Sequence, residues 1–198
     1  MVSWDGILEK TIAGIIGGLI ATALLKLVSL LHRPKLDIMF EADDTYTVAF
    51  VEQNGQRNEF LYVHLNIINK SKTMAQGCKV FILKLEQKID NQFKEIPLKT
   101  HLTLKWANEL ESKGFEGLEI PGNFRRRVDL IHGPHKNNQA FALFIESGPR
   151  GVPNGFAKGE YRFTIQSSGL NTNTIAKKFI LRWDNTFEKN NIDVYEEK

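Results

Sequence analysis

The feature of this chain that most constrains its fold is an apolar run close to the amino terminus. The run extends roughly from Thr11 to Leu31, and eleven of its residues are Ile, Leu or Val. At about 1.5 Å per residue, a helix of this length measures roughly 31 Å and matches the hydrocarbon core of a bilayer. The alternative, a buried core helix, fits poorly because nearly every side of the helix is apolar. The sequence therefore predicts an uncleaved single-pass transmembrane helix at residues 11–33, preceded by a short tail at residues 1–10.

Charges on the two sides of this run indicate its orientation. Basic residues gather on its carboxyl side (Lys26, Arg33 and Lys35), whereas on the amino side Lys10 is balanced by two acidic residues. Because the basic flank of a span tends to stay in the cytoplasm, we expect the amino terminus outside and the rest of the chain in the cytoplasm. The alternative is a periplasmic or extracellular domain, in which residues 69–71 (Asn-Lys-Ser) would form a glycosylation sequon in a eukaryote.

One stripe of the predicted helix carries small and polar residues. It includes Gly14, Gly18, Thr22 and Lys26, which follow one another at intervals of four. A pair of glycines at this spacing lets a second helix approach closely and gain packing that lipid does not supply. The stripe therefore predicts a helix-association face, on which Lys26 either pairs with an acidic group or extends to the headgroups. The alternative is that the glycines reflect only their general frequency in membrane spans.

The region after Pro34 has the pattern of an all-β domain. Pro34 ends the helix, and short runs of alternating apolar residues follow, separated by turn signals. The expected strands are Leu36–Ala42, Thr45–Glu52, Glu59–Asn69, Gln76–Gln87, Thr100–Ala107, Asn123–Ile131, Gln139–Glu146, Gly159–Gln166 and Ile175–Trp183. This number of strands predicts a two-sheet sandwich or a small barrel at residues 36–187, with a polar tail at residues 188–198.

Alternation also predicts which side chains form the core. Four side chains of one strand and three of another should face inward, with His64 and Asn66 on the opposite face of the first strand. The inward residues are Leu61, Val63, Leu65 and Ile67, and Tyr161, Phe163 and Ile165. Trp106 and Trp183, which each end a strand, are expected in the same core.

Part of the domain resembles a known family. The run at residues 65–71 (LNIINKS), then Ala75 and Cys78, and later turns at residues 120–122 and 159–161, are similar to bacterial immunoglobulin-like modules of the CARDB type. The similarity covers roughly a third of the chain and rests on turn residues. It implies an immunoglobulin-like β-sandwich that serves interaction and not catalysis, and such modules usually lie outside the cell.

Sequence motifs of the common enzyme classes are absent. The chain has no nucleophile elbow, Walker loop, dinucleotide glycine motif, HExxH or paired CxxC, so we expect no enzyme and no cofactor. The closest approach to a metal site is residues 132–135 (His-Gly-Pro-His), which we interpret as a polar turn, and no metal is expected. The lone Cys78 excludes an internal disulfide. Of the formal charge of +3, only +1 lies beyond residue 35, which does not favour nucleic acid as a partner.

A local basic patch is the strongest candidate for binding. Arg125 and Arg127 should share one face of a strand, with Arg126 on the other, and His135 and Lys136 follow in the next turn. Guanidinium groups can hold the phosphates of anionic lipids or of a small ligand through paired hydrogen bonds. Charges of this kind also occur on ordinary solvated strands, which is the alternative interpretation.

Long loops offer a second candidate surface. Residues 108–122 and 147–158 are rich in glycine and polar residues, and they contain Phe115 and Phe156 as candidate contact residues. The alternative is that each of these rings packs back over the core. The sequence thus predicts a membrane-anchored, non-enzymatic module that binds a protein partner through its β-domain loops, with self-association through the helix. The alternative is a membrane-tethered sensor or accessory subunit that recognises an anionic lipid or small ligand.

The helix-association hypothesis makes a direct prediction. Replacing Gly14→Ile together with Gly18→Ile places two branched side chains on the close-approach face, so crosslinked species of the intact protein in membranes should decrease. Crosslinking followed by gel analysis measures this effect. An unchanged pattern of crosslinked species would remove the hypothesis.

Overall fold

The computed structural model describes residues 20–24, 33–41, 46–53, 56–110, 113–134, 141–143, 145–146, 152–153, 155–184 and 191–197. The chain forms two compact units, Met1–Arg33 and Pro34–Lys198. Each unit is described by itself.

In the first unit, residues 20–24 are helical and exposed, including the apolar side chains of Ile20 and Leu24. Within the part of the chain that the structure describes, no helix is both long enough and apolar enough to cross a membrane. Thr22 lies in this short helix, whereas Gly14, Gly18 and Lys26 fall outside the described residues. The predicted span and its association face therefore stay predictions.

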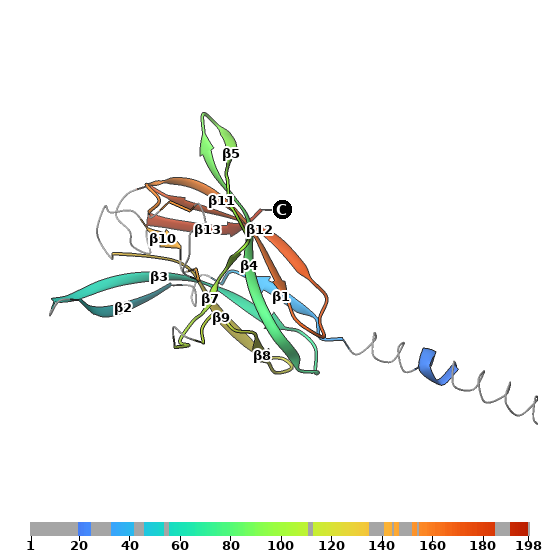
Figure 1. The fold of residues 1–198 in the computed structure, drawn as a ribbon. Coiled ribbons are helices and arrows are strands. Elements are labelled where there is room, and N and C mark those ends of the chain that lie inside the picture. The colour runs from blue at the N-terminus through green and yellow to red at the C-terminus, as the bar shows by residue number, and fades with distance from the viewer. Residues whose placement is uncertain are drawn as a thin grey trace, which may run out of the picture. The chain divides into compact units, whose positions relative to one another are not determined.

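The second unit is all-β, as expected, and its described strands form two antiparallel sheets (Figure 1). Sheet 1 is built around the long strand β3, which pairs with β9 on one edge and with β1 and β2 on the other; β10 and β7 continue from the far edge of β9. Its strands are β1 (Leu36–Met39), β2 (Tyr46–Gln53), β3 (Gln56–Asn69), β7 (Lys105–Trp106), β9 (Arg125–Pro134) and β10 (Ala142–Leu143).

Sheet 2 is built around β4 and runs in the order β13-β12-β11-β4-β5. The short strands β6 and β8 also pair with β4, on the edge that β5 uses. Its strands are β4 (Ala75–Ile89), β5 (Gln92–Ile96), β6 (Leu102–Thr103), β8 (Leu118–Ile120), β11 (Gly159–Ser168), β12 (Ile175–Trp183) and β13 (Ile192–Glu196).

Residues 102–106 connect the two sheets directly. β6 pairs with β4 of sheet 2, and β7, which begins two residues after β6 ends, pairs with β9 of sheet 1. Leu104 lies between them, and its N–H donates to the carbonyl of Val80 at 2.9 Å. The single strand predicted at Thr100–Ala107 is thus divided between the sheets, and it closes one side of the sandwich.

The core between the sheets confirms the predicted inward residues. All seven side chains named from the alternation are at most 1% exposed, and so are Trp106 and Trp183. Val63 and Leu65 contribute from the centre of sheet 1, and Phe163 contributes from the centre of sheet 2. A domain of this size can bury such a core without disulfides, and Cys78 is a free, buried thiol whose pKa burial raises to about 11.

The Asn69 side chain fixes the turn between β3 and β4. Its amide nitrogen donates to the carbonyls of Thr73 (2.7 Å) and Ile120 (3.0 Å), and its oxygen accepts from the N–H and the hydroxyl of Ser71 (3.1 and 2.7 Å). Asn69 is fully buried. Since both amide hydrogens are used and the nitrogen is enclosed, the folded domain has no room for a glycan at this sequon.

Three strands, β5, β8 and β13, were not predicted from the sequence. β5 follows a two-residue turn at Asp90 and Asn91, whose φ values of 53° and 60° are those of a type I′ hairpin. β8 lies within the predicted long loop 108–122, and β13 lies within the predicted polar tail, where it pairs with β12. The turn predicted at residues 133–134 is also absent, because Gly133 and Pro134 continue β9 and pair with β3.

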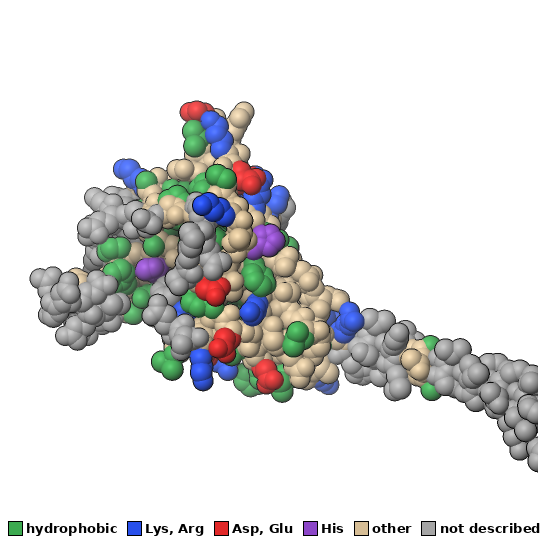
Figure 2. All heavy atoms as spheres, in the orientation of Figure 1, with side chains coloured by type: hydrophobic (Ala, Val, Ile, Leu, Met, Phe, Trp, Pro, Cys, Tyr) green, Lys and Arg blue, Asp and Glu red, His purple; other side chains and the backbone are tan. Residues whose placement is uncertain are grey.

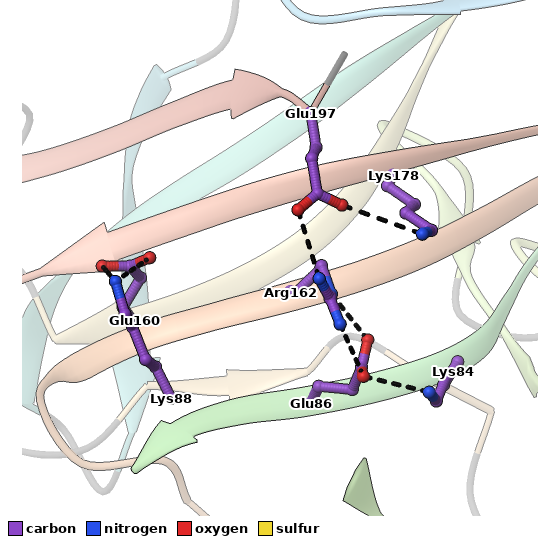
Figure 3. Close-up of polar contacts among 7 residues, drawn as sticks. All are labelled: Lys84, Glu86, Lys88, Glu160, Arg162, Lys178 and Glu197. Atoms are coloured by element: carbon purple, nitrogen blue, oxygen red, sulfur yellow. Dashed lines mark hydrogen bonds and ion pairs between the residues drawn. The ribbon is translucent and has the colours of Figure 1, made fainter. Parts of the chain in front are cut away.

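The outer face of sheet 2 carries a network of ion pairs across three strands (Figure 3). Glu86 of β4 accepts two hydrogen bonds from Arg162 of β11, at 2.7 and 2.8 Å, and one from Lys84 at 2.9 Å. Arg162 also reaches Glu197 at 3.2 Å, and its guanidinium lies 4.2 Å from the centre of the Phe93 ring. The Arg162 pair, opposed by desolvation and helped by Lys84, lowers the pKa of Glu86 to about 2.

This network predicts acid sensitivity. A carboxyl whose pKa falls from 4.5 to about 2 on folding stabilises the domain above pH 4.5. That stability is lost as the pH falls from about 4.5 toward 2. Glu86→Gln should lower the free energy of unfolding at pH 7 by about 2 kcal/mol and flatten its pH dependence in that window.

Denaturant titrations of the full chain in detergent, followed by tryptophan fluorescence at several pH values, measure this effect. Glu95→Gln is the matched control, since Glu95 is 59% exposed and its pair with Lys84 is worth less than about 1 kcal/mol. Equal losses in the two variants would contradict the assignment.

Candidate functional site

Two adjoining hollows on the outer face of sheet 1 form the candidate site. The first, the His64 hollow, has a volume of about 230 Å³, and the second, the arginine hollow, about 390 Å³. Asn108 and Arg127 line both, so the two hollows are neighbours. The His64 hollow is also lined by Thr47, Ala49, Tyr62, His64, Lys105 and Asp129, and the arginine hollow by Ala107, Glu109, Arg125 and Arg126.

An irregularity in the β3–β9 ladder places the key acidic group. Val63 pairs with Ile131, but the next residue, His64, pairs with Asp129, so the register skips Leu130. A bulge of this kind changes the side to which the following residues point. Asp129 therefore lies beside His64 on the outer face, while its neighbour Val128 still enters the core.

His64 and Asp129 form a buried polar pair at the base of the first hollow. The imidazole Nδ1 lies 2.6 Å from the Asp129 carboxylate, and both side chains are 6% exposed. A buried carboxylate is unfavourable unless it has a partner. The pair therefore places an acidic side chain and an imidazole close together among the residues that line the hollow.

A row of rings continues from His64 along the same face. Tyr62 stacks on His64 with centroids 6.3 Å apart, and on its cross-strand neighbour His132 at 5.7 Å; Phe60 follows at 6.1 Å from His132. Burial, reinforced by the Asp129 charge, raises the pKa of the Tyr62 hydroxyl. Burial lowers the pKa of His132, which opposes its protonation. Of this row, Tyr62 and His64 line the hollow itself.

Other lining residues of the hollow come from β7 and the turn after it. Lys105 points away from the core while its neighbour Trp106 enters it, and Trp106 Nε1 donates to the carbonyl of Glu116 at 3.1 Å. The Lys105 stem lies against Gly114, where a Cβ would meet it at 2.6 Å. Asn108 adopts a left-handed conformation (φ 64°), which turns the chain at the point where the two hollows meet.

This arrangement suits the binding of an anion. Four cations, Lys105 and Arg125 to Arg127, line the hollows together with two carboxylates, Glu109 and Asp129. Arg125 also pairs with Glu41, and it is half-exposed. The face drawn in Figure 2 carries basic and acidic side chains interspersed. Because the formal charge beyond residue 35 is only +1, the concentration of arginines at this site is a local feature.

The structure brings together part of the predicted basic patch. Arg125 and Arg127 share the outer face of β9 and line the same hollow. Arg126, which alternates to the other face, is exposed and also lines this hollow. His135 and Lys136 lie outside the described residues. In the described part of the chain, no group of three or more His, Cys, Asp or Glu residues is placed to hold a metal ion.

The two loop phenylalanines have different environments. Phe156 is 3% exposed; it stacks on Phe141 at 5.1 Å and meets Tyr161 edge-on at 5.6 Å. Phe156 is therefore not a surface contact, and the alternative that its ring packs over the core is confirmed, because this loop segment pairs with residue 141 and turns the ring inward. Phe115 is half-buried in the turn at residues 113–115.

Sequence reasoning missed most residues of the His64 hollow. It placed His64 on the face opposite the core but assigned no role to Tyr62, Lys105, Asn108 or Asp129. The signal for Asp129 was a break in alternation, since Val128, Leu130 and Ile131 all enter the core.

Comparison of the chain with protein-family models, with curated proteins and with solved structures finds no match.

The position of Phe156 can be tested by stability. Phe156→Ala should lower the free energy of unfolding by about 3–5 kcal/mol because it removes a buried ring from an aromatic cluster. Phe115→Ala, the matched control from the other loop, should cost clearly less. Thermal or denaturant unfolding of the full-length variants gives both values. Similar small losses of unfolding free energy in the two variants would contradict the burial of Phe156.

Proposed function

We propose that this chain is a membrane-anchored, non-enzymatic binding module. In this proposal, residues 11–33 hold the chain in the bilayer, and the β-domain binds a protein partner through an acidic group of that partner. The observation that carries the proposal is the pair of adjoining hollows on sheet 1, which three consecutive arginines and Lys105 line. Paired hydrogen bonds from guanidinium groups are the usual means of holding a carboxylate or phosphate.

The strand order supports an immunoglobulin-like sandwich, the finer form of the fold proposal. In sheet 1, β1, β3, β9 and β7 are successive neighbours, and in sheet 2 the order is β12, β11, β4, β5. Lettered along the chain, with β7 as D and β5 as the added C′ strand, these are the A-B-E-D and G-F-C-C′ arrangements of immunoglobulin domains. Folds of this type commonly present binding surfaces on their sheets and loops, so the order favours interaction without specifying a partner.

Tyr161 provides independent support for the same fold. It lies near the start of β11, the strand that corresponds to F, and its hydroxyl donates to the carbonyl of Ala157 at 2.7 Å. A tyrosine at this point that bonds back to the backbone a few residues earlier is a recurring feature of immunoglobulin-like sandwiches. Phe163 occupies the position two residues later, where antibody domains place a disulfide cysteine, and it is fully buried.

A small anionic ligand is the second candidate for the hollows. Their volumes, about 230 and 390 Å³, are close to those of small-molecule sites, and the ring of Tyr62 lies beside the cations. A membrane-tethered sensor or accessory subunit would use the same recognition chemistry. The two candidates therefore share one anion-binding site and differ in what carries the anion.

The proposal predicts that two arginines determine anion affinity. Arg125→Gln together with Arg127→Gln removes the guanidinium groups. Because glutamine is neutral, the variant does not repel the anion as an acidic substitution would. Binding of a glutamate-rich peptide, citrate or inorganic phosphate to the full chain in nanodiscs should weaken by about tenfold or more, as measured by calorimetry at constant ionic strength.

Lys178→Gln is the control for nonspecific attraction, because Lys178 lies on sheet 2 and is half-exposed. Equal affinities in the wild type and the double arginine variant would overturn the proposed site. Tight binding of citrate or phosphate with weak binding of the peptide would favour the sensor. A preference for the peptide, together with a protein captured from solubilised membranes only by the wild type, would favour the partner-binding module.

A further inference from the structure

Three turns meet at the end of the domain where its chain begins (Figure 1). They are residues 70–74 between β3 and β4, residues 121–124 between β8 and β9, and residues 169–174 between β11 and β12. Backbone bonds join them: the N–H of Asn123 donates to Ser71 at 2.9 Å, and that of Leu170 donates to Gln76 at 2.8 Å. We call this surface the three-turn end.

The start of β1 belongs to the same end. The N–H of Lys70 donates to the carbonyl of Lys35 at 2.8 Å, and Leu36 pairs with Asn69. The contact between two of the turns is close enough to require glycine, since a Cβ at Gly122 would lie 2.2 Å from the Lys72 carbonyl. The three-turn end is therefore a built surface that includes the first residues of the domain.

Each turn exposes one large apolar side chain. Met74 is 44% exposed, Phe124 is 64% exposed and Leu170 is 87% exposed. Turn tips of soluble proteins are usually polar, as Asp90 and Asn91 are on the hairpin between β4 and β5. Three apolar tips on adjacent turns therefore indicate a surface that meets an apolar phase.

The charged residues of the three turns are all basic. The three turns contain Lys70 and Lys72 and neither Asp nor Glu, and Lys35 precedes β1. Lys70 also pairs with Asp37, at the edge of the surface. Apolar side chains flanked by lysines are the composition that binds the interface of a bilayer containing anionic lipids.

Chain connectivity identifies the bilayer concerned. This step rests on the proposed anchoring by residues 11–33, after which only Pro34 and Lys35 precede β1. Because a residue spans at most about 3.6 Å, Leu36 starts within roughly 11 Å of the end of such a span. The three-turn end is then the part of the domain nearest to the headgroups.

We infer that the three-turn end lies on the surface of the bilayer that anchors the chain. Met74, Phe124 and Leu170 enter the interface, and Lys35, Lys70 and Lys72 contact anionic headgroups. This contact would fix the orientation of the domain, with the hairpin between β4 and β5 directed away from the membrane.

Depth-dependent fluorescence quenching tests the inference on the full chain. The buried Cys78 is first replaced by Ala, and an environment-sensitive label is attached at Leu170→Cys or, as the control, at Asn91→Cys on the β4–β5 turn. The chain is reconstituted into phosphatidylcholine vesicles with or without phosphatidylserine, some of which carry brominated acyl chains. The label at position 170 should shift to the blue and lose intensity to the brominated lipid, whereas the label at position 91 should not.

The outcomes separate this inference from the proposed anchoring. If the protein floats with the vesicles after alkaline extraction but the label at position 170 is quenched no more than that at position 91, the anchor stands and the inference fails. If the protein does not float, both fail. Lys70→Glu with Lys72→Glu should abolish the added quenching that phosphatidylserine produces, and an undiminished effect would overturn the role of the lysines.

Discussion

The pairing of β3 with β9 is the constraint on which the rest of the domain depends. It joins the two longest strands of sheet 1, and its inner side supplies the centre of that sheet's core. Its outer side supplies His64, Asp129 and Arg127, so the same ladder builds the candidate site. The bulge at Leu130 allows the ladder to serve both the core and the site. It keeps the apolar side chains of β9 inside and places the Asp129 carboxylate outside.

Much of the fold followed from alternation, and the exceptions have physical reasons. Strands with one buried face, such as β3 and β11, were predicted within a few residues because a period of two is unambiguous there. β5 and β13 were missed because each is only five residues long and mixes charged with apolar residues, although both pair with the strand that precedes them in the chain. Gly133 and Pro134 suggested a turn. Pro134 nevertheless fits as the last residue of β9, where its missing N–H costs no ladder hydrogen bond.

The candidate site was less predictable than the fold. Arg125 and Arg127 could be paired from their spacing, since alternate residues of a strand share a face. The position of Lys105 near these arginines could not be predicted, because it depends on residues 102–106 crossing from one sheet to the other. Asp129 required the bulge, and the closeness of Asn108 to the arginines required a left-handed residue. Sites formed by long-range pairing and irregular backbone are not encoded in any local pattern.

The three-turn end and the arginine hollow meet at the start of β9. Phe124 belongs to the three-turn end, and Arg125 and Arg126, which follow it directly, line the arginine hollow. If the three-turn end rests on the bilayer, the hollow opens close to the headgroups, where anionic lipid is abundant. A lipid phosphate and an acidic group of a partner would then compete for the same arginines. The buried Asp129, which lines the His64 hollow together with Lys105 and Arg127, reduces the net positive charge only in that hollow, which would therefore favour a directed, hydrogen-bonding ligand over diffuse attraction to the membrane.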